Sequence, residues 1–417
     1  MTKRLILAFV FLSWHLVACS NGDSGISSGL PDKPSAEEDS PGTETISEEM
    51  RVKITGEDLY ISAKLDAKTD ILYWFKKCMF NELFTFYRVG TIDNNMPTPA
   101  TLPDASPTSL LNLAYSDNIG PFNITGYGWC GGNHPYLDEV TQTARNIGYR
   151  IYIDGKEIKT DLSTLTKEIK IEVINEIMNP SKADTSSGKT LLNEILCIET
   201  VNYSIYRNNI QVLVTHEFQN ESPVTVQMYY GMQSMFDKET HTLTANGKYV
   251  DWTVQKDVST FTKKEYPSFR RFIEKSANAY QSSYLFADGL GNHEEISDDD
   301  IIFIGNSSNK TYHKIIADRE HKKGDIIHWS GVYTWFKSPV SDDDLLCYEG
   351  VIDNKKVLFI DCKKSVDRTI QLPVDYTKKS FTIIEKSKSI TITGNKVTAK
   401  GLRIVSDGSG SCVITFD

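Results

Sequence analysis

Apolar and polar residues alternate with a period of two along much of this 417-residue chain. The alternation is clearest in five runs, at residues 149–153, 169–173, 212–218, 224–230 and 389–393. Such β-branched and aromatic runs, separated by turn signals like Asp154-Gly155, are typical of strands whose successive side chains point to opposite faces. A helical pattern is scarce, and its best candidate is short, at residues 268–279. The pattern predicts an all-β fold of packed antiparallel sheets.

The N-terminus carries an export signal. A basic start precedes an apolar run at residues 5–17, which is too short for a stable membrane span. The run closes on Leu-Val-Ala-Cys, ending at Cys19, and this ending resembles the lipobox of bacterial lipoproteins. The resemblance implies removal of residues 1–18 and lipidation of Cys19, which would anchor the protein to a membrane. An ordinary cleaved signal with an accidental cysteine is the alternative.

The segment after Cys19 is predicted to be a tether. Residues 20–48 are rich in Gly, Ser, Asp, Glu, Pro and Thr and nearly lack large apolar residues, so we expect disorder over residues 19–50. Ser20 resembles the sorting signal of Gram-negative outer-membrane lipoproteins. That resemblance implies a lipid-anchored protein of the outer membrane, with the body expected at the cell surface, although the sequence does not encode the face.

The body divides by strand length and composition. Roughly 365 residues remain after the tether, enough for one large domain and a small one. From residue 341 onward the strands are shorter and Lys is more frequent. The sequence therefore predicts a main β domain at residues 51–340 and a small C-terminal β module at residues 341–417.

Charge bears on the class of partner. The formal net charge of -10, without a local basic stripe, argues against binding nucleic acid through its phosphates. An acidic body can still bind an acidic glycan where positive groups are concentrated in a groove. The acidic runs at residues 298–300 and 342–344 read as solvated loops. Calcium there would need ligands from elsewhere, so no cofactor is predicted and calcium stays an alternative.

Cysteine spacing gives no metal site. Six cysteines follow Cys19, namely Cys78, Cys130, Cys197, Cys347, Cys362 and Cys412. They form no CxxC motif and no Cys/His pattern of the kind that binds zinc. Because export permits disulfides, Cys347 with Cys362 is the best local pair, and buried free thiols are an equal alternative.

The glycine-rich segment at residues 126–136 is the first candidate for function. Its glycines permit positive φ, and we expect them to display several aromatic and polar side chains on a loop. These side chains are Trp129, Asn133, His134 and Tyr136. The alternative is a tight structural turn whose polar groups only satisfy the backbone.

A predicted hairpin at residues 209–233 is the second candidate. Alternation places His216 on its more apolar face, and Tyr230 lies in the returning strand. A half-buried histidine would stay unprotonated and could act as a base. A core histidine satisfied by one hydrogen bond is an equally good reading.

Two later segments form the third candidate. The first contains Lys310, Tyr312 and His313, and the second alternates Trp329, Tyr333 and Trp335. Flat aromatic rings complement the C–H faces of pyranoses, so such a stripe could bind sugar. Sheet core is favoured for at least one of the two tryptophans.

The second and third candidates together resemble the large antiparallel supersandwich of galactose-mutarotase-like proteins over about residues 51–337. The resemblance implies a fold that recurs in aldose epimerases and polysaccharide lyases. The family's epimerases use a His/Glu pair, and the sequence does not assign the glutamate. With the lipobox, the chain also resembles glycan-harvesting surface lipoproteins of gut Bacteroidetes, which implies a neighbouring glycan-uptake complex.

We expect a polysaccharide lyase that cleaves a uronic-acid glycan by β-elimination. The reaction needs a base for the C5 proton, a group that neutralises the adjacent carboxylate, and an acid for the leaving oxygen. The residues expected to supply these functions are Asn133, His134, His216, Tyr230, Tyr312 and His313. The residues expected to bind substrate are Trp129, Tyr136, Arg270, Arg271, Lys310 and Trp335, with the cations clamping carboxylates.

Three alternatives compete with elimination. A glycan-binding lipoprotein would need only Trp129, Tyr136 and Trp335 to hold sugar for a neighbouring transporter. Hydrolysis usually needs two carboxylates across the scissile bond, and no such pair stands out. A sugar epimerase gains little from a lipid tether at the cell surface.

Overall fold

The computed structural model describes most of the chain after residue 45. It covers residues 46–417, except for residues 103–106, 113–118, 236–240, 245–248, 252–258, 263–269, 276–278, 287–299, 306–309, 338, 342–343 and 373. The predicted export signal, Cys19 and nearly all of the predicted tether lie outside the described residues. So do the larger parts of the two acidic runs.

The predicted all-β fold is confirmed. Every strand pairing found is antiparallel, and the described residues contain only two short 3-10 turns, Pro180–Lys182 and Val374–Tyr376. The helix expected at residues 268–279 is wrong, because strand β20 (Arg271–Lys275) runs there. All four residues from Arg271 to Glu274 are buried, so both faces of this strand are covered and its apolar spacing is no guide to a helix.

Three large sheets make up the main body. The first has the order β10-β1-β2-β3-β4-β5. Its strands are β1 (Met50–Thr55), β2 (Asp58–Asp66), β3 (Thr69–Cys78), β4 (Leu83–Asp93), β5 (Ser109–Asn112) and β10 (Leu162–Thr166).

The second sheet has ten strands in the order β18-β17-β20-β21-β24-β15-β14-β11-β8-β9. Besides β20 they are β8 (Ala144–Ile153), β9 (Lys156–Ile158), β11 (Ile169–Met178), β14 (Ile195–Tyr206), β15 (Asn209–Phe218), β17 (His241–Thr244), β18 (Tyr249–Asp251), β21 (Tyr280–Leu285) and β24 (Ile326–Phe336). The Asp154-Gly155 turn joins β8 to β9, as expected, with both residues at positive φ.

The third sheet has the order β19-β22-β23-β16-β6-β7. Its strands are β6 (Pro121–Ile124), β7 (Gly128–Gly131), β16 (Val224–Met235), β19 (Ser259–Thr262), β22 (Asp300–Gly305) and β23 (Lys310–His321). A separate two-stranded ribbon pairs β12 (Ala183–Asp184) with β13 (Leu191–Leu192).

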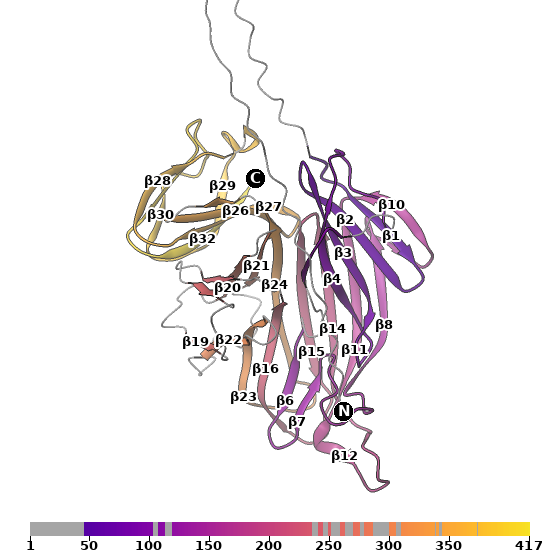
Figure 1. Ribbon diagram of the computed structural model, residues 1–417. Helices are drawn as coiled ribbons and strands as arrows, with labels where there is room; N and C mark the ends of the chain where they lie inside the picture. The colour runs from indigo at the N-terminus through magenta and orange to yellow at the C-terminus, as the bar shows by residue number, and fades with distance from the viewer. Residues whose placement is uncertain are drawn as a thin grey trace, which may run out of the picture. The chain divides into compact units, whose positions relative to one another are not determined.

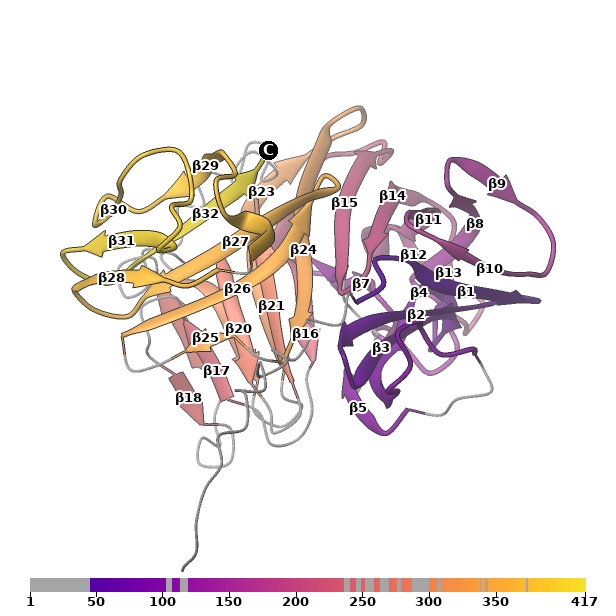
Figure 2. The same ribbon diagram turned by 90° about the horizontal axis from the view of Figure 1, so that it is seen from above.

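One hydrophobic core is shared by these three sheets. Phe75 from the first sheet, Val212 and Trp335 from the second, and Tyr229 from the third belong to the same buried cluster. Strands β2–β4 accordingly lie beside β11 and β14 in both views (Figures 1 and 2). Each of the three sheets therefore has an inner face in this shared core.

The hairpin predicted at residues 209–233 is wrong, although its first strand is correct. Strand β15 pairs with β14 and β24, whereas β16 pairs with β6 and β23 in another sheet. The intervening residues 219–223 are therefore a connection between sheets. The alternation predicted for β15 is confirmed: Val212, Val214, His216 and Phe218 are buried, while Leu213 is 42% exposed.

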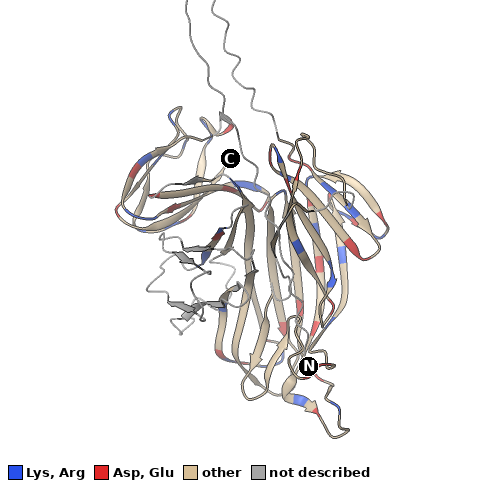
Figure 3. Cartoon of the chain, in the orientation of Figure 1, with Lys and Arg blue, Asp and Glu red and all other residues tan. Residues whose placement is uncertain are grey.

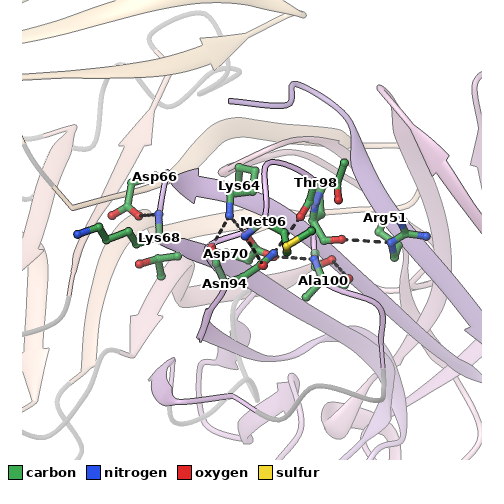
Figure 4. Close-up of polar contacts among 12 residues, drawn as sticks. Arg51, Lys64, Asp66, Lys68, Asp70, Asn94, Met96, Thr98 and Ala100 are labelled. Atoms are coloured by element: carbon green, nitrogen blue, oxygen red, sulfur yellow. Dashed lines mark hydrogen bonds and ion pairs between the residues drawn. The ribbon is translucent and has the colours of Figure 1, made fainter. Parts of the chain in front are cut away.

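A buried ion pair fixes a long loop onto the first sheet (Figure 4). Lys64 Nζ lies 2.8 Å from Asp70 Oδ1, and both side chains are almost completely buried. Lys64 also donates to the Asn94 carbonyl at 2.7 Å, and the Ala100 amide donates to Asp70 Oδ2 at 2.6 Å. Because each charge meets several partners, the pair is satisfied rather than left bare in the core.

The C-terminal part of the chain forms two small sheets. Their strands are β25 (Val340–Ser341), β26 (Leu345–Ile352), β27 (Lys355–Cys362), β28 (Val366–Ile370), β29 (Phe381–Lys386), β30 (Ile390–Ile392), β31 (Leu402–Ser406) and β32 (Gly410–Phe416). The orders are β25-β26-β27-β32-β29 and β28-β31-β30. These sheets enclose a core of their own, and a second apolar cluster joins β26 and β27 to β20, β21 and β24.

The six described cysteines are buried free thiols, the alternative to a Cys347–Cys362 disulfide. Burial raises the pKa of Cys362 to about 11 and that of Cys412 to about 12, so neither is a reactive thiolate at neutral pH. Among the described residues, no group of His, Cys, Asp or Glu is arranged to hold a metal ion. Within those same residues no helix has the length and apolarity needed to cross a bilayer.

Candidate functional site

Four aromatic side chains form a continuous row on the third sheet. Going along it, they are Tyr136, Trp129, Tyr230 and Tyr312, here called the aromatic row. The ring centroids of Tyr136 and Trp129 are 6.2 Å apart, those of Trp129 and Tyr230 are 6.1 Å apart, and those of Tyr230 and Tyr312 are 5.1 Å apart. The first three rings are half-buried, and Tyr312 is 9% exposed. The aromatic row thus combines residues from all three sequence candidates. Trp129 and Tyr136 come from the first, Tyr230 from the second and Tyr312 from the third.

His134 extends the row at its Tyr136 end. Its ring centroid lies 5.7 Å from that of Tyr136 in an edge-to-face arrangement, and its side chain is half-buried. Of the three predicted catalytic histidines, His134 is the only one whose side chain is not buried in the core.

A tight turn presents Trp129 to the outer face. The Tyr127 amide donates to the Ile124 carbonyl at 2.9 Å, and Gly126 takes φ +79°, a conformation that glycine adopts without strain. Trp129 pairs with Asn123 across the β6–β7 hairpin, and the next residue, Cys130, points into the core. Trp129 was expected on a loop, and it lies instead on a short strand, which holds its ring more firmly.

Alternation along β16 presents Tyr230. Tyr229 is buried against Phe122, so the next residue, Tyr230, points to the outer face. The pairing with β23 shifts at this point because β23 carries an extra residue, Ile315. Gly120 lies so close behind Tyr230 that a Cβ there would stand 1.5 Å from the Tyr230 carbonyl oxygen. Only glycine fits at that position, which also has φ +97°.

A basic residue accompanies the row. Lys314 is the cross-strand partner of Tyr230, and alternation along β23 places it on the same face as Tyr312. Elsewhere, basic and acidic residues are interspersed along the described strands rather than gathered on one sheet (Figure 3). Lys310 begins β23, and its side chain lies outside the described residues.

Asn133 lies behind the row and not in it. Its side chain is buried, and its Oδ1 accepts a hydrogen bond from the Leu83 amide at 3.4 Å. It lines an internal cavity of about 10 Å³ together with Asn175 and Glu199, which is space for about one water molecule. This placement is that of a structural amide, the alternative reading of the glycine-rich segment.

His216 is a core histidine. Its side chain is completely buried, and its Nε2 lies 2.9 Å from Glu199 Oε2. Asn175 donates to the other carboxylate oxygen of Glu199 at 2.9 Å, and the rings of Phe122 and Tyr229 pack edge-on against the imidazole. A general base must reach the proton that it removes, so we give His216 no role in proton transfer. Glu199, which faces His216 across β14 and β15, was missed because cross-strand partners need the register.

His313 is also closed off. It points to the inner face, where burial, with the nearby Arg270 charge, lowers its pKa to about 3. A group with so low a pKa is a weak base at neutral pH, and this one has no path to a polymer.

The predicted carboxylate clamps are occupied. Arg271 is buried and pairs with the buried Asp361, and Arg270 pairs with Glu385. Both contacts link the main body to the C-terminal module, so neither arginine faces a substrate groove. Trp335 is completely buried in the shared core, where it packs against Tyr73 and Tyr333. Trp329 is also buried in this core. Both tryptophans of the predicted aromatic stripe are therefore core residues.

Known proteins show only a distant likeness to this chain. No protein-family model matches the chain, and a search of curated proteins found no significant match. Among solved structures, the galactosidase domain of α-galactosidase-sucrose kinase AgaSK aligns with a TM-score of 0.37 and 8% identity, covering 68% of this chain and 41% of that one. GH36 α-galactosidase AgaB from Geobacillus stearothermophilus aligns with a TM-score of 0.38 and 8% identity, covering 69% and 41%. The chain thus spans about two-fifths of the length of these structures.

Proposed function

We propose that the protein binds an acidic polysaccharide along the aromatic row. The observation that carries this proposal is the row itself: four stacked or tilted rings, each 5.1 to 6.2 Å from the next, on the outer face of one sheet. Successive sugar units of a polysaccharide are spaced on a similar scale. Rings that already pack on one another lose little conformational freedom when a ligand binds, which favours affinity.

We infer the class of polysaccharide that binds from the charge beside the aromatic row. Lys314 is paired in register with Tyr230, so a cation accompanies the centre of the row. A polymer that carries carboxylates would gain an ion pair there in addition to stacking. A lipid at Cys19 and a surface location, both proposals from the sequence, would keep the bound polymer near a neighbouring uptake complex.

Removal of the central indole should weaken binding. We expect Trp129→Ala to lower the affinity for a binding polysaccharide by about tenfold or more, because a central stacked aromatic is a typical binding hot spot. The measurement is affinity electrophoresis with polygalacturonate, alginate and chondroitin sulfate. Trp74→Ala is the matched control, since Trp74 is a half-buried tryptophan on the first sheet, stacked on Tyr60 at 5.3 Å. Equal retardation of the two variants would refute a role for the row.

A second candidate function is β-elimination at the same row. The observation that favours it is the half-buried His134 at one end, whose ring centroid lies 5.7 Å from that of Tyr136. A histidine and a tyrosine so placed can remove the C5 proton and protonate the leaving oxygen of one sugar unit.

Elimination is detected by the ultraviolet absorbance of the unsaturated uronate product. If the row is catalytic, absorbance rises with one of the acidic polysaccharides, and His134→Ala lowers the initial rate by about a hundredfold. His328→Ala is the control, because His328 is a half-buried histidine on the ten-stranded sheet, away from the row. A flat trace across the panel, together with retained binding, would leave the protein a glycan binder without this activity.

A further inference from the structure

A second cavity lies where the C-terminal module meets the main body. Its volume is about 430 Å³, within the usual range for small-molecule sites, which favour junctions between domains. The turn between β14 and β15, the end of β24 and strands β26 and β27 contribute to its walls. We call it the junction pocket, and it contains none of the residues of the aromatic row.

Four cations line the junction pocket. They are Lys167, Arg207, Lys337 and Lys356. Lys356 pairs with Glu48 at 2.6 Å, and Lys337 lies 3.7 Å from Asp66 and donates to Thr69 at 2.9 Å. By contrast, neither Lys167 nor Arg207 forms an ion pair with any described residue. Three carboxylates, those of Glu48, Asp66 and Glu349, share the lining, so the four cations leave it with one net positive charge.

Arg207 is held in place by its backbone. It has φ +47°, a strained conformation for a residue other than glycine, and its carbonyl accepts a hydrogen bond from the Tyr73 hydroxyl at 2.9 Å. Its Nη2 donates to the Lys64 carbonyl at 3.4 Å, whereas its Nε is buried without a hydrogen-bond partner. A buried donor without an acceptor is costly, and the guanidinium keeps its full charge beside the pocket that Arg207 lines.

Glu48 shows that this position favours a carboxylate. Its pKa is lowered, first by the hydrogen bond from Lys356 and further by the charges of Lys356, Arg207 and Lys167, against the opposing effect of burial. Glu48 lies just before β1, at the start of the described chain, and its side chain is 54% exposed. A ligand could therefore displace it without opening the fold.

We propose that the junction pocket binds the carboxylate of an acidic saccharide, with Arg207 and Lys167 as its cationic partners and Glu48 as an intramolecular competitor. Arginine suits this task because its planar guanidinium matches a carboxylate, and Asn208, Asn354 and Gln371 in the lining can hydrogen-bond sugar hydroxyls. The carboxylate part of the inference rests on the pocket alone, whereas the saccharide part rests on the proposed function.

Isothermal titration of the purified protein with digalacturonate tests this proposal. We expect Lys167→Met to weaken binding about fivefold and Arg207→Gln about tenfold, and Glu48→Gln to strengthen binding about threefold. Fully methyl-esterified digalacturonate should not bind. Arg403→Gln is the control, because it removes an exposed ion pair with Asp367 in the C-terminal module, away from the pocket. Lys167 is exposed, so its replacement keeps the test valid if Arg207→Gln fails to fold.

Three outcomes would overturn the proposal: no heat with digalacturonate, equal affinity in Lys167→Met and the unchanged protein, or equal binding of the ester. The affinity for adipate, a plain dicarboxylate, is measured for comparison. If adipate binds as tightly as digalacturonate, the pocket is an anion site that does not recognise the saccharide, and the proposal is wrong as stated. Trp129→Ala should bind digalacturonate normally. Failure of the row and failure of the pocket are thereby distinguished.

Discussion

Replacing Asp361 by asparagine should lower the free energy of unfolding by about 3–5 kcal/mol, because it leaves the buried Arg271 charge without its partner. Both side chains are only 2% exposed. Arg271 also donates to the Ile360 carbonyl at 3.2 Å, and its guanidinium lies 5.3 Å from the ring centroid of Phe359. This packing leaves little room for water to solvate a charge that has lost its counterion.

Urea unfolding of Asp361→Asn and of a matched control measures this effect. The control is Asp367→Asn, which breaks the exposed Arg403–Asp367 pair, whose side chains are 57% and 58% exposed. Surface pairs contribute little, so we expect a loss below about 1 kcal/mol there. A similar loss in both variants would mean that the Arg271–Asp361 contact does not stabilise the junction with the C-terminal module. Restored stability in Arg271→Met combined with Asp361→Leu would assign the loss to the unpaired charge.

Acidification from about pH 7 to pH 5 should destabilise the fold through two buried histidines. Burial lowers the pKa of His313 to about 3 and that of His321 to about 4, from an ordinary value of 6.5. Below pH 6.5 the unfolded chain takes up these protons and the folded protein does not, so the stabilisation is complete above pH 6.5 and is lost as pH falls. Linkage gives about 2 kcal/mol for each histidine between pH 6.5 and pH 5.

His313→Leu isolates one of these contributions. Leucine suits the apolar site beside Phe272, whose ring centroid lies 4.9 Å from that of His313. The unfolding free energy of this variant, measured by urea at both pH values, should fall by about 2 kcal/mol less than that of the unchanged protein. An identical fall in both proteins would show that His313 is not held neutral by the fold.

Local patterns in the sequence predict the strands well. Alternation at residues 212–218 identifies β15 and places His216 on the inner face, because the side-chain period of a strand follows directly from its backbone. The sheet to which a strand belongs is not encoded in the same way. Residues 219–223 resemble a hairpin turn, yet they connect two sheets, since pairing depends on long-range contacts.

The candidate site, like the fold, was predictable only where the signal is local in the sequence. Trp129, Tyr136 and Tyr230 are recognisable as unusual aromatic positions, but their convergence requires the order β23-β16-β6-β7 in one sheet. Arg271 was expected to clamp a substrate because nothing near it in the sequence indicates an acidic partner. That partner, Asp361, lies 90 positions away. The cationic residues of the junction pocket were missed for a related reason: they come from distant turns, and none belongs to a motif.

Binding along the aromatic row can be tested by hydroxyl-radical footprinting of the protein with a bound acidic polysaccharide. We expect protection of Trp129, Tyr136 and Tyr230, with no change at Tyr60, Trp74 and Tyr87, a half-buried aromatic cluster on the first sheet. Protection of that second cluster with the aromatic row left unprotected would contradict it.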